Sequence, residues 1–196
     1  AAAAKITITG KSVHPGTAKN IMKNASLIAG EFMTLLPESE TPSSTEEYEG
    51  FYHLTNMQGN VSKAVLEYII RDFDKNSFDL RKTFIRNAVE TINKKYGHIA
   101  EIEIYDQYYN MREIIEKDMS IIELAKKSMI EVGVKPILNP IRGGTDGARL
   151  SFMGLPCPNI FTGGHNFHGP YEYIPLGSMK KAVEVIVKIV ENNAKQ

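Results

Sequence analysis

The chain has 196 residues, which is long enough for one or two domains with a substantial hydrophobic core. Its 23 Lys and Arg residues are matched by 23 Asp and Glu residues, so the charge balance excludes a strongly basic surface, and we expect neither nucleic acid nor membrane as a partner. Its single cysteine, Cys157, excludes an internal disulfide framework and fits a reducing cytoplasm, where we expect the protein to be.

The beginning of the chain predicts a strand, a helix and a hairpin. Residues 5–9 alternate as a strand with no preceding Met, from which we expect a piece of a longer protein. We expect Thr17 to cap a helix that extends to about Leu36, because apolar residues recur along one stripe. Residues 51–57 and 65–73 follow as two strands, and the turn between them favours a hairpin.

A second helix and a last strand complete this part of the chain. We expect Ser77 to cap a helix that extends through Tyr96, and Gly97 to end it. Residues 99–105 alternate apolar and polar side chains as a strand. The order βαββαβ predicts an antiparallel sheet with both helices on one face, which is the ferredoxin-like arrangement. We assign residues 1–109 to this domain.

Beyond residue 109, helices alternate with short apolar segments. The sequence predicts three helices and two strands, at residues 120–132, 136–139, 145–153, 159–162 and 178–193. Such alternation is typical of a parallel sheet that is covered on both faces. Two or three strands are too few to stabilise such a sheet. We therefore expect residues 110–196 to be part of an α/β domain whose other strands lie elsewhere.

A cation and two glycines precede the helix expected at residue 145. Arg142 is followed by Gly143 and Gly144, whose backbone amides are not shielded by a Cβ atom, and this combination suits an anion. A guanidinium beside such amides binds a planar carboxylate better than a Lys side chain would. The sequence therefore predicts an anion site at residues 142–144, while Arg149 is expected to pair on the helix surface.

Two histidines follow the last short strand that the sequence predicts. This strand continues into Gly163 and Gly164 and then reaches His165 and His168. Ligands of α/β proteins gather at the carboxyl ends of strands, so these two side chains are candidates for a functional site. The residues alone equally permit two packed histidines of a surface loop.

Three motifs together resemble the tripeptide-aminopeptidase branch of the two-zinc exopeptidase family. They read S-V-H-P-G-T-A-K at residues 12–19, P-I-R-G-G-T-D-G-A-R-L at residues 140–150 and N-I-F-T-G-G-H-N-F-H-G at residues 159–169. The resemblance covers essentially the whole chain. It implies that residues 1–109 are the family's lid, or dimerisation, domain. Residues 110–196 would then be the C-terminal portion of the catalytic domain, without its N-terminal portion.

The resemblance implies a site for two zinc ions, of which this chain supplies one ligand. The family's other metal ligands precede the lid, and no residue here occupies their positions. Family members place a Glu four residues after the last histidine ligand, and Glu172 has this spacing from His168. The resemblance therefore assigns the metal to His168, because a neighbouring carboxylate would hold its imidazole in one tautomer. His165 would be a hydrogen-bonded neighbour.

The resemblance also assigns roles to residues of the lid. The family's lid histidine stabilises the oxyanion that forms when water attacks the scissile carbonyl, often in the site of the opposite subunit, and His14 takes this place here. A lid arginine binds the substrate carboxylate in related enzymes, which implies this role for Arg71 beside Arg142, Gly143 and Gly144. Without the resemblance, His14 is an exposed turn residue and Arg71 a surface charge.

The implied activity is the release of the N-terminal residue of a tripeptide by metal-activated water. A site that fixes both ends of a small peptide measures its length, which would explain a preference for tripeptides. Two alternatives remain at this point. The protein is another peptidase or acylamino-acid hydrolase of the same family, or this chain alone is a non-catalytic module for dimerisation and substrate binding.

A homodimer formed by residues 1–109 is the expected assembly. A four-stranded lid sheet has two edges with unpaired backbone groups, and such edges are covered, charged or paired. Lid domains of relatives associate across a two-fold axis, which would carry His14 toward the neighbouring site. We expect the helix at residues 17–36 or an edge strand to lie at the interface.

Overall fold

A computed structural model describes residues 1–195, and these divide into two compact units. The first unit joins Ala1–Tyr109 with the short segment Pro140–Gly144. The second unit joins Asn110–Asn139 with the residues from Thr145 onward. Five residues of the C-terminal half thus pack with the N-terminal unit, and they include Arg142, Gly143 and Gly144.

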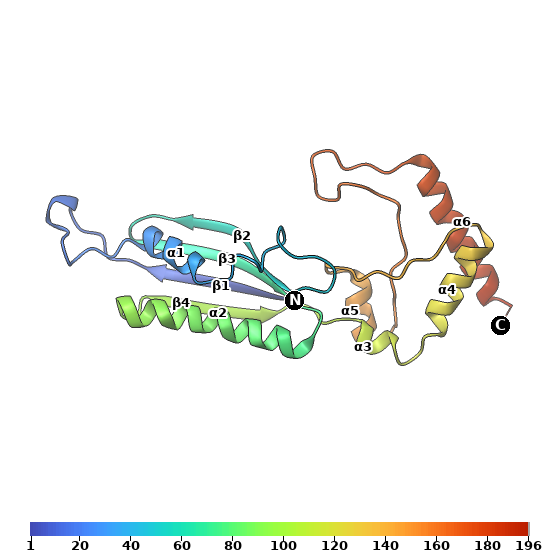
Figure 1. Cartoon of the computed structure of the whole chain (residues 1–196), viewed down its shortest axis with the longest axis horizontal. Helices are drawn as coiled ribbons and strands as arrows, with labels where there is room; N and C mark the ends of the chain where they lie inside the picture. The colour runs from blue at the N-terminus through green and yellow to red at the C-terminus, as the bar shows by residue number, and fades with distance from the viewer. Residues whose placement is uncertain (196) are drawn as a thin grey trace. The chain divides into compact units, whose positions relative to one another are not determined.

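The first unit is built on one antiparallel sheet of four strands (Figure 1). Its strands are β1 (Ala2–Thr9), β2 (Phe51–Gly59), β3 (Lys63–Arg71) and β4 (Ala100–Asp106), in the spatial order β2-β3-β1-β4. The first strand lies between β3 and β4 and pairs antiparallel with both. The hairpin of β2 and β3 is confirmed, with a register shift between Leu54 and Asn56. With one helix before β2 and one after β3, this is the ferredoxin-like arrangement that the sequence predicts.

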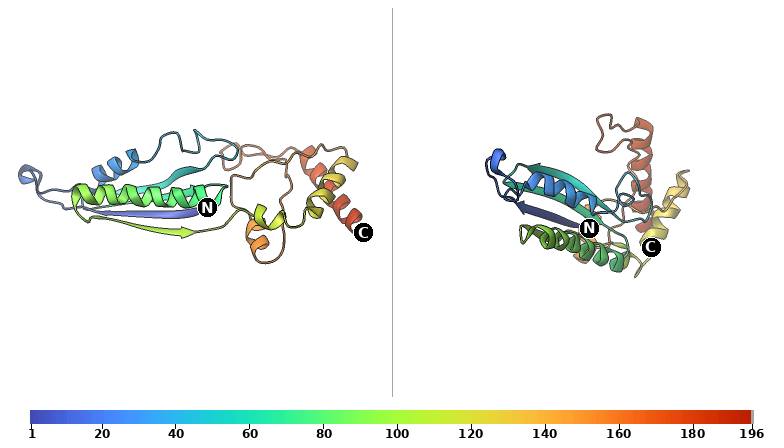
Figure 2. Two further views of the ribbon diagram at one scale, coloured as in Figure 1. Left: turned by 60° about the horizontal axis from the view of Figure 1, so that its bottom comes forward. Right: turned by 60° about the vertical axis from the view of Figure 1, so that its left-hand side comes forward.

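Two helices, α1 (Ala25–Thr34) and α2 (Lys75–Tyr96), cover one face of the sheet and contact each other (Figures 1 and 2). Alternate residues of β1 point into this layer, because successive side chains of a strand face opposite ways. The side chains of Ile6 and Ile8 are fully buried there, and Phe32 and Ile85 bury the facing sides of the two helices. One contiguous core therefore stabilises the first unit.

The first helix begins later than the sequence predicts. Its cap is Asn24, whose side-chain oxygen accepts hydrogen bonds from the amides of Ser26 and Leu27, whereas Thr17 ends a short 3-10 turn, η1 (Pro15–Thr17). The predicted helical stripe is interrupted because Asn20 has a φ of 63° and Lys23 pairs with Lys11 in a β-bridge. Residues 10–24 instead form an arm that extends beyond the sheet, with η1 near its tip (Figures 1 and 2).

The second helix also starts before its predicted cap. Asp74 precedes it, and its carboxylate accepts a hydrogen bond of 2.8 Å from the amide of Ser77, so Ser77 lies inside the first turn. Aspartate serves well here because its charge also favours the positive end of the helix. The predicted end is confirmed, since Gly97 follows the last helical residue with a φ of 79°.

Up to residue 195, the second unit contains four helices. They are α3 (Arg112–Ile115), α4 (Ser120–Glu131), α5 (Asp146–Phe152) and α6 (Leu176–Asn193). The last three confirm the predicted helices, and Thr145 caps α5 through a hydrogen bond from the amide of Ala148. Helices α4 and α6 pack against each other, and the Asn192 amide donates to the Ser128 hydroxyl at 3.1 Å.

The two strands predicted in the second unit are wrong. Neither residues 136–139 nor residues 159–162 form a strand in the part of the chain that the structure describes. A strand exists only through backbone hydrogen bonds to a neighbour, and these apolar segments have no neighbouring strand here. Ile137 and Leu138 accordingly remain 73% and 68% exposed.

Within residues 1–195, no helix combines the length and the apolar character that are needed to cross a bilayer.

Candidate active-site residues

Arg71 and Arg142, which are 71 positions apart in the sequence, lie together in the first unit. Arg71 is the last residue of β3, and its Nη1 atom donates a hydrogen bond to the backbone oxygen of Arg142. The central guanidinium carbons of Arg71 and Arg142 lie 5.8 and 5.1 Å from the centre of the Phe51 ring. The fold thus brings two of the predicted substrate-binding residues to one place.

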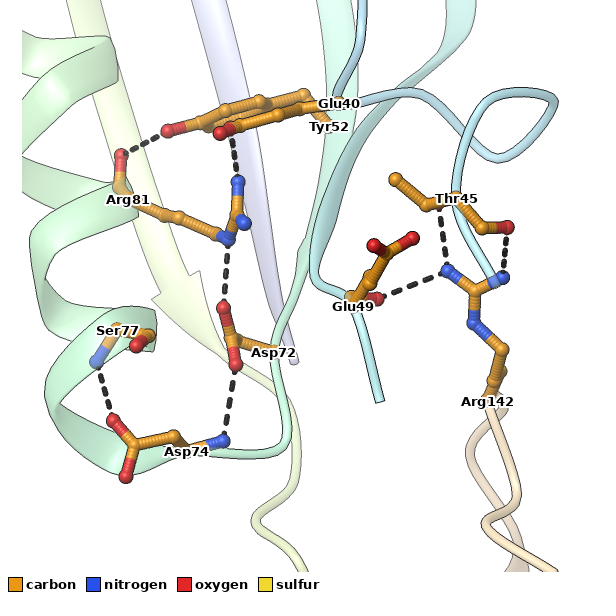
Figure 3. A network of polar contacts seen from close by, with 9 residues as sticks. All are labelled: Glu40, Thr45, Glu49, Tyr52, Asp72, Asp74, Ser77, Arg81 and Arg142. Carbon is orange, nitrogen blue, oxygen red and sulfur yellow. Dashed lines mark hydrogen bonds and ion pairs between the residues drawn. The ribbon is translucent and has the colours of Figure 1, made fainter. Parts of the chain in front are cut away.

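The terminal nitrogens of Arg142 contact the loop between α1 and β2 (Figure 3). Nη1 donates to the backbone oxygen of Thr45, and Nη2 donates to the Thr45 hydroxyl at 2.7 Å and to the Glu49 backbone oxygen at 3.0 Å. All three acceptors are neutral oxygens. The guanidinium predicted to face an anion therefore also fixes residues 140–144 to this loop.

The two glycines beside Arg142 differ in what surrounds them. A Cβ atom on Gly144 would lie 2.6 Å from the ring of Tyr108, whereas on Gly143 the nearest atom would be Arg71 Nη1 at 3.9 Å. Gly144 is thus required for the close approach of Tyr108. Burial raises the pKa of Tyr108, although the positive charge of Arg71 acts in the opposite direction. The sequence predicted a role for the backbone amides of the two glycines, but it did not predict the contact between Gly144 and Tyr108.

A third arginine, Arg81 of α2, forms a fully paired network that the sequence reasoning missed (Figure 3). Its guanidinium pairs with Asp72, through Nε at 2.8 Å, and with Glu40. The Tyr52 hydroxyl donates to the Arg81 backbone oxygen at 3.2 Å, and burial raises the pKa of Tyr52 to about 12. No spacing in the sequence connects these residues, because they come from the loop before β2, the start of β2, the position after β3 and α2.

His14 lies on the exposed arm. Its Nδ1 atom accepts a hydrogen bond of 3.1 Å from the amide of Gly16. A neutral imidazole whose Nδ1 accepts a hydrogen bond carries its proton on Nε2, so the outer nitrogen of the ring is a donor. The turn at Pro15 and Gly16 therefore sets the tautomer of this histidine.

His165 and His168 lie in one exposed loop of the second unit, with different contacts. His165 pairs with Tyr173 in a β-bridge, and their rings stack with centroids 5.0 Å apart. The backbone amide of His168, rather than its imidazole, donates to Glu172 at 3.0 Å. His168 has a φ of 62°, a left-handed conformation that is uncommon outside glycine.

The described residues contain no complete metal site. Residues 1–195 include no group of three or more His, Cys, Asp or Glu side chains that is placed to hold an ion. His168 has the ligand chemistry that zinc prefers, and its imidazole is not engaged by Glu172. His168 is therefore a single candidate ligand, and the described residues do not complete a metal site around it.

Residues 1–100 match the family model described as the peptidase dimerisation domain, and the chain belongs to this family. Over 97% of its length it is 62% identical to peptidase T of Caldanaerobacter subterraneus and 58% identical to peptidase T of Clostridium acetobutylicum. It covers 47% of each of these two proteins, so the chain spans about half the length of the curated relatives it matches.

Solved structures share the fold at lower sequence identity. A tripeptidase from Staphylococcus aureus matches all of this chain and 52% of its own, with a TM-score of 0.82 and 19% identity. The aminopeptidase PepT from Bacillus cereus matches 98% of this chain and 52% of its own, with a TM-score of 0.77 and 22% identity. The sequence resemblance to this family of peptidases is thus confirmed over the whole chain.

Proposed function

We propose that the complete protein is an aminopeptidase that removes the N-terminal residue from tripeptides with two bound zinc ions. One observation carries this proposal, namely the similarity of the whole chain to peptidase T at 54–62% identity. In this proposal residues 1–109 are the lid and residues 110–196 are the C-terminal portion of the catalytic domain. The proposal includes a cytoplasmic location, which the single cysteine favours.

His168 is the metal ligand that this chain would supply. A related fold, the YxeP protein of Bacillus subtilis, is described as a dinuclear metal-binding peptidase, with a TM-score of 0.61. Bound zinc would lower the pKa of a water molecule and polarise the scissile carbonyl. The left-handed backbone of His168, whose amide donates to the Glu172 carboxylate, would set the direction of its side chain in this role. His165, stacked on Tyr173, is assigned to the support of the loop.

His14 would stabilise the oxyanion from the lid. Its neutral ring presents an Nε2–H donor, because Nδ1 is occupied by the Gly16 amide, and an oxyanion requires a donor. The arm that carries it extends beyond its own sheet, which suits a residue that acts in the site of a partner subunit (Figure 2). The match to a peptidase dimerisation domain supports a homodimer formed by the lid.

The dimer interface is proposed at α1 or at an edge strand of the sheet. The edges are β2 and β4, and the outer side of α1 exposes Leu27 by 72%. Edge strands present unpaired backbone groups, and an exposed apolar side chain gains from burial in an interface. Pairing across either element would bury both kinds of group.

Arg71 and Arg142, with the amides of Gly143 and Gly144, would hold the C-terminal carboxylate of the peptide. Their proximity supports this assignment, since two guanidinium groups at one place bind a carboxylate more strongly than one. The proposal requires Arg142 either to offer its Nε–H or to exchange the loop oxygens that it contacts. Binding of the carboxylate at this place and of the N-terminus near the metals would set the preferred length of the peptide.

A second candidate is a different hydrolase of the same fold. A hydantoinase/carbamoylase-family amidase from Burkholderia vietnamiensis matches 97% of this chain with a TM-score of 0.73 and 14% identity. The shared fold therefore does not by itself distinguish a peptidase from an acylamino-acid hydrolase. This chain alone would in either case be a non-catalytic module.

The experiment is a comparison of free tripeptides with N-acylated amino acids as substrates of the complete protein. We expect rapid release of the N-terminal residue from tripeptides, and His168→Ala should remove bound zinc and activity together. The matched control is His165→Ala in the same loop, which should keep most of the metal. Preferred cleavage of N-acylated substrates would favour the second candidate, and equal loss of zinc in both variants would contradict the assignment of His168.

A further inference from the structure

Three buried side-chain donors of the first unit lack an acceptor. They are the hydroxyl of Tyr108, the Nε–H of Arg71 and the Nε–H of Arg142, and none has a hydrogen-bond partner among residues 1–195. A buried donor without an acceptor costs about 1–3 kcal/mol, and more when the group is charged. Unsatisfied groups are rare in native structures, so three of them in one unit call for an explanation.

The three donors belong to one cluster. Arg71 donates to the backbone oxygen of Arg142, and both guanidinium groups lie near the ring of Phe51. Tyr108 packs on Gly144, two residues after Arg142, and the charge of Arg71 acts on its hydroxyl. The donors are thus contributed by the end of β3, by the segment after β4 and by residues 140–144.

The charge of this cluster is also unbalanced. Neither Arg71 nor Arg142 forms an ion pair within the described residues, whereas Arg81 in the same unit pairs with both Asp72 and Glu40. A partly buried guanidinium without a carboxylate retains an attractive potential for an anion. An acceptor with several lone pairs and a negative charge would satisfy the donors and the charge together.

The two arginines are not equally available. Both terminal nitrogens of Arg142 contact Thr45 and Glu49, so this guanidinium is largely occupied. Arg71 uses Nη1 for the Arg142 backbone oxygen and leaves its Nε–H unpaired. Tyr108 remains protonated at neutral pH because burial raises its pKa, so its hydroxyl is able to donate. Arg71 and Tyr108 are therefore the donors with the fewest competing contacts.

We propose that Tyr108 is a substrate-positioning residue whose hydroxyl, with the Nε–H of Arg71, donates to the C-terminal carboxylate of the peptide. This inference rests on the proposed aminopeptidase function and adds a residue to its binding site. Gly144 is needed to keep Tyr108 in this position, because any side chain at residue 144 would displace the Tyr108 ring. Arg142, whose terminal nitrogens fix the loop and whose backbone oxygen accepts from Arg71, would reach the same carboxylate through its Nε–H.

The test measures binding by this chain, so that it does not depend on catalysis. Trialanine and trialanine amide are titrated into the chain, and amide chemical shifts are followed by NMR. We expect the free acid to bind at least about tenfold more tightly than the amide, since the lost contacts are charge-assisted. Tyr108→Phe should abolish most of this preference. The matched control Tyr105→Phe removes an exposed hydroxyl of β4 and should keep it.

Thermal unfolding separates this role from a structural one. Tyr108→Phe removes an unsatisfied buried hydroxyl, so the midpoint temperature of unfolding of this variant should equal or exceed that of the wild type. If the hydroxyl instead made a structural hydrogen bond, its removal would lower this temperature. A second variant, Gly144→Ala, should also lose the preference for the acid, because it displaces the ring. A wild-type chain without preference for the acid, or a Tyr108→Phe chain that keeps it, would overturn the inference. A failure of the proposed function would instead appear as absent tripeptide hydrolysis by the complete protein.

Discussion

The first unit encloses its own hydrophobic core, whereas the second unit leaves much of its apolar surface in solvent. Phe32, Ile6 and Ile85 are fully buried between the sheet and its helices. In the second unit α6 exposes a row of aliphatic side chains, of which Val183 and Val190 are 59% and 63% exposed. Contiguous exposed apolar surface marks an interface. The difference shows that the first unit completes its core with its own residues, whereas the apolar side of α6 is not covered by residues 1–195.

A similar contrast separates two arginine clusters within the first unit. Arg81 forms ion pairs with Asp72 and Glu40, and the pair with Glu40 connects α2 to the loop before β2 (Figure 3). Arg71 and Arg142 have no carboxylate partner among the described residues. The charge of Arg81 is balanced within the fold, whereas the charges of Arg71 and Arg142 still attract an anion. The pairing state thus distinguishes the structural arginine from the candidates for function.

The largest change in stability is expected from Phe32→Ala, which opens a cavity in the core of the first unit. The free energy of unfolding should fall by about 3–5 kcal/mol, as for other buried Phe residues. Leu80→Ala on the exposed side of α2 is the control and should change it by less than about 0.5 kcal/mol. Denaturant unfolding measures both. Similar losses in the two variants would mean that α1 does not pack as described.

Arg81→Met should have the next largest effect. The side chain of Asp72 is only 7% exposed, so removal of its partner leaves a buried charge unpaired and should cost about 3 kcal/mol. Arg71→Met removes a single hydrogen bond to a backbone oxygen and should cost less than about 1.5 kcal/mol. Thermal unfolding of the two variants provides the comparison. If Arg71→Met were the more destabilising change, carboxylate pairing would not distinguish the structural arginine from the candidates for function.

The smallest effect concerns the pH dependence of α2. The hydrogen bond from the backbone amide of Ser77 lowers the pKa of Asp74 below its usual value of 3.8. A carboxyl group whose pKa is lower in the folded state stabilises the protein above the pKa of the unfolded state, and this contribution is lost as the pH falls through the folded pKa. Asp74→Asn keeps a cap that does not titrate. The variant should therefore lose less stability than the wild type between about pH 7 and pH 3. If the free energies of unfolding of the wild type and of Asp74→Asn fell equally over this pH range, the prediction would be contradicted.

Much of the fold could be predicted because its signals are local. Alternation in β1 and β4, periodicity in α4 and α6, and Gly97 at the end of α2 each act within a few residues. The start of α1 was wrong because the β-bridge of Lys11 with Lys23, a contact across the arm, interrupts the helical stripe before Asn24. The strands at residues 136–139 and 159–162 were wrong because strand formation depends on a neighbour.

The site could be predicted only in part, for the same reason. The motifs identified Arg142 and His168 as candidates, but no local pattern places Arg142 beside Arg71 or against Thr45 and Glu49. The local sequence around Tyr108 does not decide between hinge packing and function. The substrate-positioning role of Tyr108 is inferred from the fold, which packs Tyr108 on Gly144 and leaves the Tyr108 hydroxyl without an acceptor.

The most direct test of the account is the recovery of activity from two inactive variants of the complete protein, His14→Ala and His168→Ala. Alone, His14→Ala should reduce kcat by about 10²–10³-fold and His168→Ala should be inactive. When the two are refolded together, half of the dimers are mixed, and each mixed dimer has one site with both an intact metal ligand and an intact histidine from the partner lid. We predict about one quarter of the wild-type rate of tripeptide hydrolysis. A mixture no more active than its separate components would contradict a lid-paired dimer in which His14 acts across the interface.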